Sequence, residues 1–414
     1  MKRVVVTGMG VVTPLGNTRE QFREGLLAGR SGIAPITRFD ATGLPSRIAG
    51  QCHIVNRRFK DRKIDFAVSA AQSAVEHADQ DAVALQQYYA PHTCGLSMGV
   101  GLELLNMPDL VRYAADREAG ALAASTNIEF LQTPGDLCVR EMARVIPFGM
   151  PSAIHISACA AGTDAIGDAF LRIARGRARL MLAGGADSMI NPLGLAGFCK
   201  LNALSTRNDT PARASRPFDR TRDGFVLGEG AAVLVLECRS DAIRRGARIY
   251  AEIVGYANTL DAHSISEPEP RGSGAAHAMR QACAMAGVSG EAISYINAHG
   301  TGTPKNDPAE TRAIKAVCGN HARTIPVSAT KSMIGHLISA AGAVEAAASI
   351  LCANAGMVHP TINLEQPDPE CDLDYVPGAS RALDVDYFAS NSFAFGGMNA
   401  CLVFRNEGIL RAER

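Results

Sequence analysis

Residues 154–159, Ile-His-Ile-Ser-Ala-Cys, return in altered form at residues 325–330 as Ile-Pro-Val-Ser-Ala-Thr. Each copy is a short apolar run that ends in Ser-Ala and leads into an alanine- and glycine-rich helical pattern. Weaker matches in the same order pair residues 3–6 with 248–251 and residues 231–236 with 399–404. Because the order is kept, the chain is predicted to contain a duplicated α/β unit, with a boundary near residue 245.

Short strand patterns alternate with helical patterns in both halves, residues 1–245 and residues 246–414. This alternation predicts βαβ units and covered, largely parallel sheets. In a duplicated unit, the equivalent strand-to-helix corners can face one shared cleft. The first corner carries Cys159, and the second carries Lys331 and then His336. We therefore expect one active site built from both halves.

Composition narrows the class of protein. The 414 residues carry 41 basic and 41 acidic side chains, and this balance argues against broad nucleic-acid binding. The most apolar stretch, residues 333–358, includes His336 and Glu345 and therefore predicts a buried helix, not a membrane span. The chain turns to Gly8 before a signal-peptide core could develop. Eleven cysteines without a Cys-x-x-Cys pair predict free thiols in the cytoplasm.

Cys159 is the first candidate for chemistry. It begins a predicted helix, where unpaired N–H groups and the helix dipole favour a thiolate. The small residues 160–162 leave room for a substrate to reach the sulfur. Taken alone, this pattern is more typical of a plain buried cysteine.

Two histidines are the second candidates. An apolar strand leads His299 into the glycine-rich turn 300–304, and His336 starts a helix shortly after Lys331. Two neutral imidazoles can donate hydrogen bonds to one enolate oxygen while Cys159 carries an acyl group. Each histidine alone is more typical of a hydrogen-bonded core residue. Neither has a carboxylate or a third histidine at metal-ligand spacing, so no metal site is predicted.

Two further features have both a structural and a functional interpretation. Lys331 lies among apolar neighbours, either exposed at a helix start or buried with Glu345 as its counter-ion. Residues 391–399, Asn-Ser-Phe-Ala-Phe-Gly-Gly-Met-Asn, fit a β-turn with core phenylalanines. They also fit a glycine hinge that carries Phe395 as a gate over an acyl pocket.

Taken together, these motifs resemble those of the β-ketoacyl-acyl carrier protein synthases, most closely the type II elongating enzymes. The likeness rests on residues 157–159, 297–301, 331–336 and 391–397, and it covers almost the whole chain. It implies an α/β thiolase-like fold, with two duplicated βαβ-rich halves in a five-layered arrangement. The family members are usually dimers.

The resemblance also implies a reaction without a bound cofactor or metal. Cys159 takes an acyl group from the phosphopantetheine arm of an acyl carrier protein, with its own N–H and that of Phe395 as an oxyanion hole. Malonyl-acyl carrier protein then loses carbon dioxide, and the carbanion attacks the acyl-cysteine. His299 and His336 stabilise the enolate, while Lys331, paired with Glu345, organises the site electrostatically.

Further roles carried over from the family concern the arm and the partner protein. Thr301 and Thr303 are expected to hydrogen-bond the pantetheine arm. Residues 57–63, Arg-Arg-Phe-Lys-Asp-Arg-Lys, form the densest basic run, which is either a solvated helix face or a docking site for an acidic carrier protein. For the second alternative, Arg62 and Lys63 are the predicted contacts.

Some positions depart from the pattern of the elongating enzymes. Met398 stands where a threonine is usual, Ser264 where a histidine is common, and residues 103–148 show little likeness. The sequence therefore leaves open the length of the acyl chain, the pathway, and whether the dimer has identical or different subunits. The alternatives are a ketosynthase subunit of a type II polyketide or polyene pathway, working with a partner subunit, and a non-catalytic subunit like the chain-length factors. The retained Cys159 and His299 count against the second alternative.

Overall fold

A computed structural model describes residues 1–53, 58–79, 82–102, 107–120, 134–145 and 152–406. Its main feature is a 10-stranded sheet with the order β10-β9-β13-β14-β8-β1-β7-β6-β4-β5. The strands of the first half are β1 (Val4–Val12), β4 (Cys94–Val100), β5 (Ala153–His155), β6 (Leu180–Ser188) and β7 (Glu229–Cys238). Those of the second half are β8 (Ala251–Leu260), β9 (Ile293–Asn297), β10 (Val327–Ser328), β13 (Tyr387–Phe393) and β14 (Met398–Asn406).

The order of the strands shows the duplication directly. Outward from the middle of the sheet, the first half runs β1, β7, β6, β4, β5, and the second half runs β8, β14, β13, β9, β10. Each half thus places its strands in the same relative order, and β1 and β8 join the halves by antiparallel pairing. The three repeated sequence segments fall on equivalent strands: β5 with β10, β1 with β8, and β7 with β14.

The expectation of largely parallel sheets needs correction, because the sheet is mixed. Pairing is parallel only toward its two outer ends, β6–β4–β5 and β13–β9–β10. The strands in the middle, from β6 through β7, β1 and β8 to β13, all pair antiparallel. The final two strands of each half therefore pair antiparallel, β6 with β7 across a long connection that includes residues 192–200 and β13 with β14 across a short turn, instead of forming βαβ crossovers.

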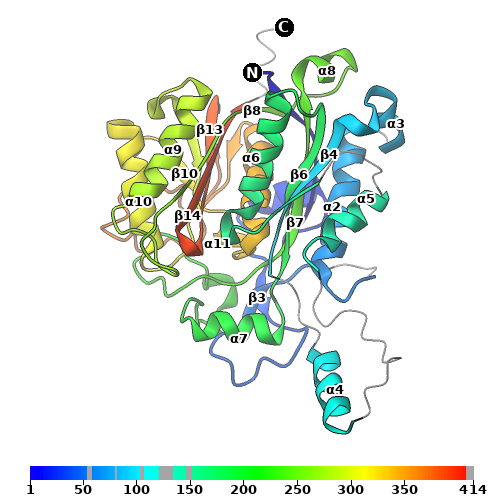
Figure 1. Ribbon diagram of the computed structural model, residues 1–414. Helices are drawn as coiled ribbons and strands as arrows, with labels where there is room; N and C mark the ends of the chain where they lie inside the picture. The colour runs from blue at the N-terminus through cyan, green and yellow to red at the C-terminus, as the bar shows by residue number, and fades with distance from the viewer. Residues whose placement is uncertain (54–57, 80–81, 103–106, 121–133, 146–151, 407–414) are drawn as a thin grey trace.

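Helices complete five layers around the two halves of the sheet (Figure 1). Helices α6 (Ala161–Ala174) and α12 (Ala341–Ala353) pack together and contact strands of both halves, so they form the central layer. Helices α2 (Arg62–Ala78) and α5 (Leu137–Val145) cover the outer face of the first half. Helices α9 (Ser273–Ala286) and α10 (Asn306–Cys318) cover the outer face of the second half. This arrangement confirms the predicted fold class.

The central layer explains the most apolar part of the sequence. Every residue of α12 except the partly buried Leu351 is buried, because the helix lies between the two halves of the sheet. Close packing against α6 requires glycine at Gly342, where a Cβ atom would lie 2.0 Å from Oγ1 of Thr163. In the described part of the chain, no helix is long and apolar enough to cross a membrane.

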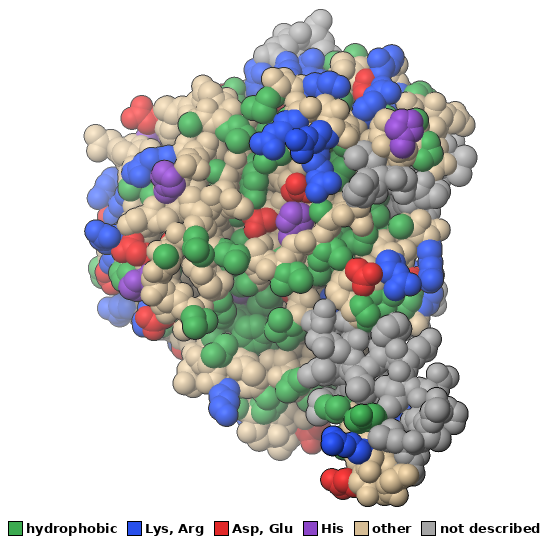
Figure 2. All heavy atoms as spheres, in the orientation of Figure 1, with side chains coloured by type: hydrophobic (Ala, Val, Ile, Leu, Met, Phe, Trp, Pro, Cys, Tyr) green, Lys and Arg blue, Asp and Glu red, His purple; other side chains and the backbone are tan. Residues whose placement is uncertain are grey.

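The remaining elements lie around this frame. The shorter α-helices are α1 (Arg19–Leu27), α3 (Ala82–Tyr88), α4 (Met107–Glu118), α7 (Pro192–Lys200), α8 (Arg239–Arg244) and α11 (Lys331–Ile334). Two small two-stranded sheets pair β2 (Ile33–Pro35) with β3 (Ile48–Gly50), and β11 (Met357–Val358) with β12 (Arg381–Ala382). On the face shown in Figure 2, charges of both signs are scattered and hydrophobic side chains gather in the lower centre.

Candidate active site

The two predicted corners open onto one cavity of about 270 Å³. Its walls include Cys159 from the first half and His299, His336, Thr301, Thr303 and Phe395 from the second. The interpretation that both halves supply one site is therefore confirmed by the geometry. A partly enclosed cavity with a thiol and two imidazoles at its wall is suited to chemistry on a reactive carbonyl compound.

Cys159 lies in the short 3-10 turn Ala158–Ala160, immediately before α6. The turn starts in a left-handed conformation, with φ of 48° at Ala158, which a non-glycine residue rarely adopts. This strained entry turns the chain sharply between β5 and α6 and leaves the thiol at the cavity wall.

Burial of Cys159 works against the expected preference for a thiolate. Burial raises the pKa of the Cys159 thiol to about 11, although the charge of Lys331 and a hydrogen bond from the backbone of Phe395 both oppose this shift. Desolvation disfavours the thiolate, and its effect is larger than that of the lysine charge and the hydrogen bond together. The resting nucleophile is therefore a neutral thiol with an N–H donor beside its sulfur.

The two imidazole rings lie edge to face, with their centroids 5.3 Å apart. Nδ1 of His336 accepts a hydrogen bond from the backbone N–H of Ile338 at 3.1 Å, and Nδ1 of His299 lies 3.2 Å from Nζ of Lys331. A backbone N–H and an ammonium group are donors only, so Nδ1 is the acceptor in both rings. Burial and the charge of Lys331 hold the pKa of both histidines well below the usual value, so both are neutral.

These contacts determine where each ring carries its proton. A neutral imidazole has one N–H, and Nδ1 is the acceptor, so the proton is on Nε2 in both His299 and His336. The cavity is thus lined by two uncharged N–H donors that can bind one oxygen atom as it gains negative charge. This matches the neutral pair of donors predicted from the sequence.

The predicted ion pair of Lys331 and Glu345 is present. Nζ of Lys331 donates to Oε1 of Glu345 at 2.5 Å, and both side chains are 1% exposed. Burial raises the pKa of Glu345 to about 7, with the lysine charge opposing this rise. The alternative of an exposed lysine at a helix start is therefore excluded, and a positive charge lies next to His299.

Phe395 and Phe393 separate the two interpretations of the C-terminal turn. Phe393 is 7% exposed and packs near His299, with ring centroids 6.0 Å apart, so it is a buried residue that also lines the cavity. Phe395 is only partly buried and lines the cavity. Gly396 and Gly397 follow with φ of 84° and 78°, in the left-handed region that favours glycine. Both aromatic residues therefore line the cavity, and the less buried ring, that of Phe395, is followed directly by the two glycines.

Thr301 and Thr303 lie on the loop between β9 and α10, with their Oγ1 atoms 2.9 Å apart. Both line the cavity. Glu310 on α10, which the sequence interpretation missed, accepts the backbone N–H groups of His299 and Gly300 at 2.8 Å each. An acidic residue in the first turns of the helix that follows a glycine-rich loop is the signal that could have identified it.

The structure does not bring Arg62 and Lys63 to the surface as free charges. Lys63 is 2% exposed, and its Nζ donates to Asp61 at 2.5 Å and to the carbonyl of Leu102 at 3.0 Å. Arg62 donates to the carbonyl of Cys52 at 2.6 Å and lies 3.2 Å from Oε1 of Glu229. Both cations are paired within the fold, and their role as direct docking contacts stays a prediction. Residues 54–57 of the same region lie outside the described residues.

Among the described residues, no group of three or more His, Cys, Asp or Glu side chains is placed to hold a metal ion.

Two departures from the expected pattern, Met398 and Ser264, lie close in the chain to residues that line the cavity. Met398 is 37% exposed at the start of β14, and Ser264 lies in the loop after β8. Most of the segment 103–148 falls outside the described residues or on α4 and α5.

Comparison with known proteins assigns a family. A profile described as "Beta-ketoacyl synthase, N-terminal domain" matches residues 1–242, and one described as "Beta-ketoacyl synthase, C-terminal domain" matches residues 250–365. The chain is 46% identical to a 3-oxoacyl-[acyl-carrier-protein] synthase 2 of Synechocystis sp., over 98% of both chains. It is 42% identical to the protein of that name from Coxiella burnetii, over 97% of this chain and 98% of the other.

Solved structures agree with this assignment. A type II polyketide ketosynthase in complex with its acyl-carrier protein matches with a TM-score of 0.86 and 32% identity, over 98% of this chain and 99% of the other. The ishigamide ketosynthase/chain length factor matches with a TM-score of 0.86 and 34% identity, over the same shares.

Proposed function

The chain belongs to the β-ketoacyl synthase family, and we propose that it elongates acyl chains by decarboxylating Claisen condensation. It is an acyltransferase that joins an acyl-enzyme thioester to malonyl-acyl carrier protein, giving 3-oxoacyl-acyl carrier protein in fatty-acid synthesis. The observation that carries the proposal is the meeting of a thiol, Cys159, with two neutral imidazole donors, His299 and His336, in one cavity.

In the first half-reaction, the sulfur of Cys159 attacks the carbonyl carbon of the acyl thioester. The N–H groups of Cys159 and Phe395 stabilise the oxygen anion that forms, because the Phe395 N–H already points at the sulfur. The bond from carbon to the pantetheine sulfur then breaks, and the proton lost by the Cys159 thiol ends on that sulfur. Acyl-Cys159 and a free pantetheine thiol result.

In the second half-reaction, the thioester carbonyl of the malonyl group accepts the Nε2–H of His299 and of His336. The bond between the α-carbon and the carboxylate breaks, and carbon dioxide leaves. The electron pair of that bond stays on the remaining fragment as an enolate, which the two imidazoles stabilise. The carbanion attacks the carbonyl of acyl-Cys159, the C–S bond breaks, and Cys159 leaves as a thiolate that takes up a proton from solvent. We propose that no cofactor or metal takes part, because loss of carbon dioxide supplies the driving force and the imidazoles supply the electrophilic contact. Full activity in the presence of a chelator is the expected result.

The partners are an acyl carrier protein and a second ketosynthase-like subunit. Thr301 and Thr303 support the first, since their paired hydroxyls face the cavity where a pantetheine arm would enter. Strand β5 supports the second, because it is the last strand of the sheet in the described part of the chain, and Ile156, directly after it, is 66% exposed. The related structures are a ketosynthase bound to its carrier protein and a ketosynthase/chain length factor. We place the reaction in the cytoplasm, with the free thiols of all eleven cysteines in support.

A ketosynthase subunit of a type II polyketide or polyene pathway is the second candidate. It is supported by the TM-scores of 0.86 to two ketosynthases of specialised pathways. A non-catalytic subunit is disfavoured, because such a subunit would not need Cys159, His299 and Lys331 assembled around one cavity.

Intact-protein mass spectrometry tests the proposal. The protein is incubated with saturated acyl-acyl carrier proteins of several lengths, and then with malonyl-acyl carrier protein. Acylation that Cys159→Ala abolishes, followed by release of a chain two carbons longer, is the expected result. Acylation by polyunsaturated or polyketo chains only would favour the second candidate. A chain that accepts no acyl group, alone or in native extract, would overturn both.

A further inference from the structure

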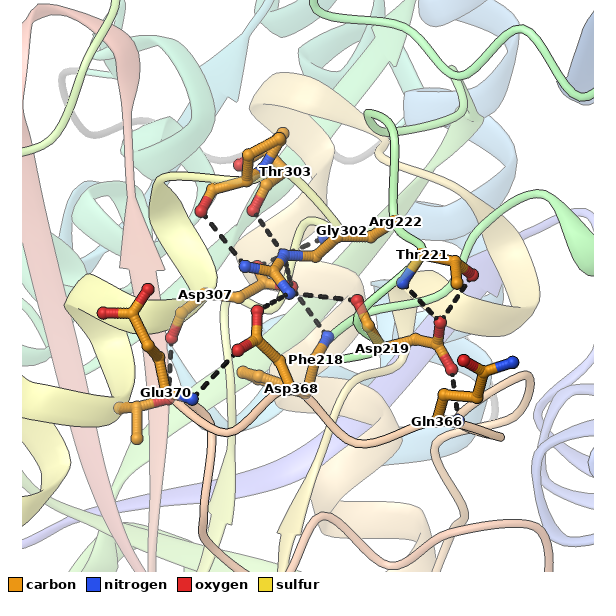
Figure 3. Close-up of polar contacts among 12 residues, drawn as sticks. Phe218, Asp219, Thr221, Arg222, Gly302, Thr303, Asp307, Gln366, Asp368 and Glu370 are labelled. Atoms are coloured by element: carbon orange, nitrogen blue, oxygen red, sulfur yellow. Dashed lines mark hydrogen bonds and ion pairs between the residues drawn. The ribbon is translucent and has the colours of Figure 1, made fainter.

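Arg222 makes several hydrogen bonds close to the cavity, although it does not line it. Its side chain is 5% exposed. Nε donates to the carbonyl of Thr303 at 3.0 Å, and Nη2 donates to the carbonyl of Pro304 at 3.1 Å. Nη1 donates to the carbonyl of Asp219 at 2.9 Å and to Oδ2 of Asp368 at 2.5 Å. Figure 3 shows the guanidinium group at the centre of these contacts.

Two of the carbonyls that Arg222 binds, those of Thr303 and Pro304, belong to the loop that carries the two cavity threonines. This loop, between β9 and α10, has no regular structure to satisfy its backbone. A guanidinium group is planar and rigid, so binding two successive carbonyls fixes the direction of the peptide chain between them. The conformation at Thr303 and Pro304 therefore depends on a side chain from the other half of the protein.

The buried carboxylate of Asp307 binds the same loop. Oδ1 of Asp307 accepts the N–H of Gly302 at 3.2 Å, and Oδ2 accepts the N–H of Phe218 at 2.7 Å. Oδ2 also lies 3.6 Å from Nε of Arg222, so the two charges compensate each other. The N–H of Gly224, close to Arg222, donates to the carbonyl of Gly302 at 3.1 Å.

Arg222 is itself held in place. Oδ2 of the neighbouring Asp219 accepts the N–H groups of Glu365 and Gln366 at 2.9 and 2.7 Å, which ties the turn before Arg222 to the C-terminal loop (Figure 3). Asp368, in that same loop, accepts from Arg222. Three separate segments thus meet at one guanidinium group, and a shift of its position would be passed to the Thr301–Pro304 loop.

We propose that Arg222 is a positioning residue for the pantetheine arm: it holds the Thr301–Pro304 loop so that the two threonine hydroxyls face the arm's amide groups. This rests on the proposed function. Lysine at this position keeps the charge but presents one ammonium group, which cannot reach both carbonyls and Asp368 together. Arg222→Lys is therefore expected to weaken recognition of the arm while leaving the thiol and the imidazoles in place.

The test compares two donors of the same acyl group. Hexanoyl-pantetheine carries the arm with its amides, whereas the S-ethyl thioester of hexanoic acid has no amide to bind. Acylation of Cys159 by each is followed by intact-protein mass spectrometry. In Arg222→Lys, the preference of the wild-type protein for hexanoyl-pantetheine is expected to fall by roughly tenfold, with KM for that donor rising, since small displacements of a binding group cost rates of this order.

Arg245→Lys is the matched control. Like Arg222, Arg245 is buried, with 4% of its side chain exposed, and its Nη2 lies 2.6 Å from Oε1 of the buried Glu237. Its Nη1 donates to the carbonyl of Ala78 at 3.1 Å. It touches no residue of the cavity loop, so Arg245→Lys is expected to keep the preference between donors even where it lowers the melting temperature. A lost preference in both variants would mean that general loosening, and not positioning, is responsible.

Asp368→Asn provides a second variant if Arg222→Lys does not fold. It removes the charged anchor of Arg222 at a side chain that is 15% exposed, and a smaller loss of preference in the same direction is expected. An unchanged preference in either folded variant would overturn the inference, as would a wild-type protein that does not distinguish the two donors. No acylation of wild-type Cys159 by hexanoyl-pantetheine or by any acyl-acyl carrier protein would instead overturn the proposed function.

Discussion

Nζ of Lys331 lies 3.2 Å from Nδ1 of His299, inside the fold, where neither side chain is more than 2% exposed. One ammonium group therefore performs two tasks. As a donor, it makes Nδ1 the acceptor and leaves the proton of His299 on Nε2. As a charge, it adds to the effect of burial in lowering the pKa of both imidazoles and opposes the rise of the Cys159 pKa.

Replacing Lys331 with methionine should mainly impair decarboxylation. Without the donor, His299 is free to carry its proton on Nδ1, where it cannot bind the enolate oxygen. Release of labelled carbon dioxide from malonyl-acyl carrier protein should fall about a hundredfold or more, as for other lost enolate or oxyanion contacts. Lys315→Met is the control, because that lysine is paired with Asp372 at the surface of α10. Unchanged carbon dioxide release in Lys331→Met would contradict this role.

Alkylation of the free enzyme should reveal the pKa of Cys159. Because burial raises that pKa to about 11, the thiol is neutral at pH 7 and its thiolate fraction grows as the pH rises. The rate of reaction with iodoacetamide should therefore still be rising at about pH 9, above the usual cysteine pKa. Cys159→Ser reports labelling of the other cysteines. A plateau below neutral pH would instead support the thiolate that the helix-start argument predicted.

Removing either imidazole should separate the two half-reactions. His299→Ala and His336→Ala are expected to retain acylation of Cys159, since neither N–H belongs to its oxyanion hole. Decarboxylation should drop by roughly a hundredfold or more in each. The pKa values of both histidines lie well below the usual value, so both rings stay neutral as the pH falls through that value. Decarboxylation by the wild-type protein should therefore not decline between about pH 8 and pH 6, as it would if an ordinary histidine became protonated. A decline centred near pH 6.5 would contradict the neutral pair.

Charge reversal at Lys63 should lower stability before it affects docking. Lys63→Glu puts a carboxylate beside Asp61 and leaves the Leu102 carbonyl without its ammonium donor. Breaking a buried pair in this way costs about 3 kcal/mol or more, which thermal unfolding would register as a lower melting temperature. Lys200→Glu, at the exposed end of α7, is the control. A stable Lys63→Glu protein whose only defect is a higher KM for the carrier protein would support the docking interpretation.

A charge directly after the edge strand should prevent the proposed subunit pairing. Ile156→Lys places an ammonium group next to β5, where a partner strand would approach, so the protein should shift from dimer to monomer in light scattering. Ile243→Lys, on α8 and 44% exposed, should leave the mass unchanged. A dimer that persists in Ile156→Lys would place the interface elsewhere.

The repeated segments show how far the sequence pattern reaches. They identified equivalent strands correctly, because short apolar runs and their flanking turns reflect local structure. The match of residues 154–159 with 325–330, however, does not align the nucleophile turn. In the structure, Ala158–Ala160 before α6 corresponds to Ile338–Ala340 before α12, and each begins in a left-handed conformation, with φ of 48° and 46°. Ser339 therefore holds the place of Cys159, and the segment with Lys331 and His336 comes before it.

The sequence by itself determined the fold class, the duplicated halves, the family and the residues Cys159, His299, Lys331 and His336, because these depend on residue types in short, ordered motifs. Tertiary structure alone decided the neutral thiol of Cys159, the buried position of Lys63, and the support given by Glu310 and Arg222. Each of these depends on which distant groups exclude water from a side chain or accept its hydrogen bonds. Such contacts join residues far apart in the chain, where spacing and periodicity carry no signal.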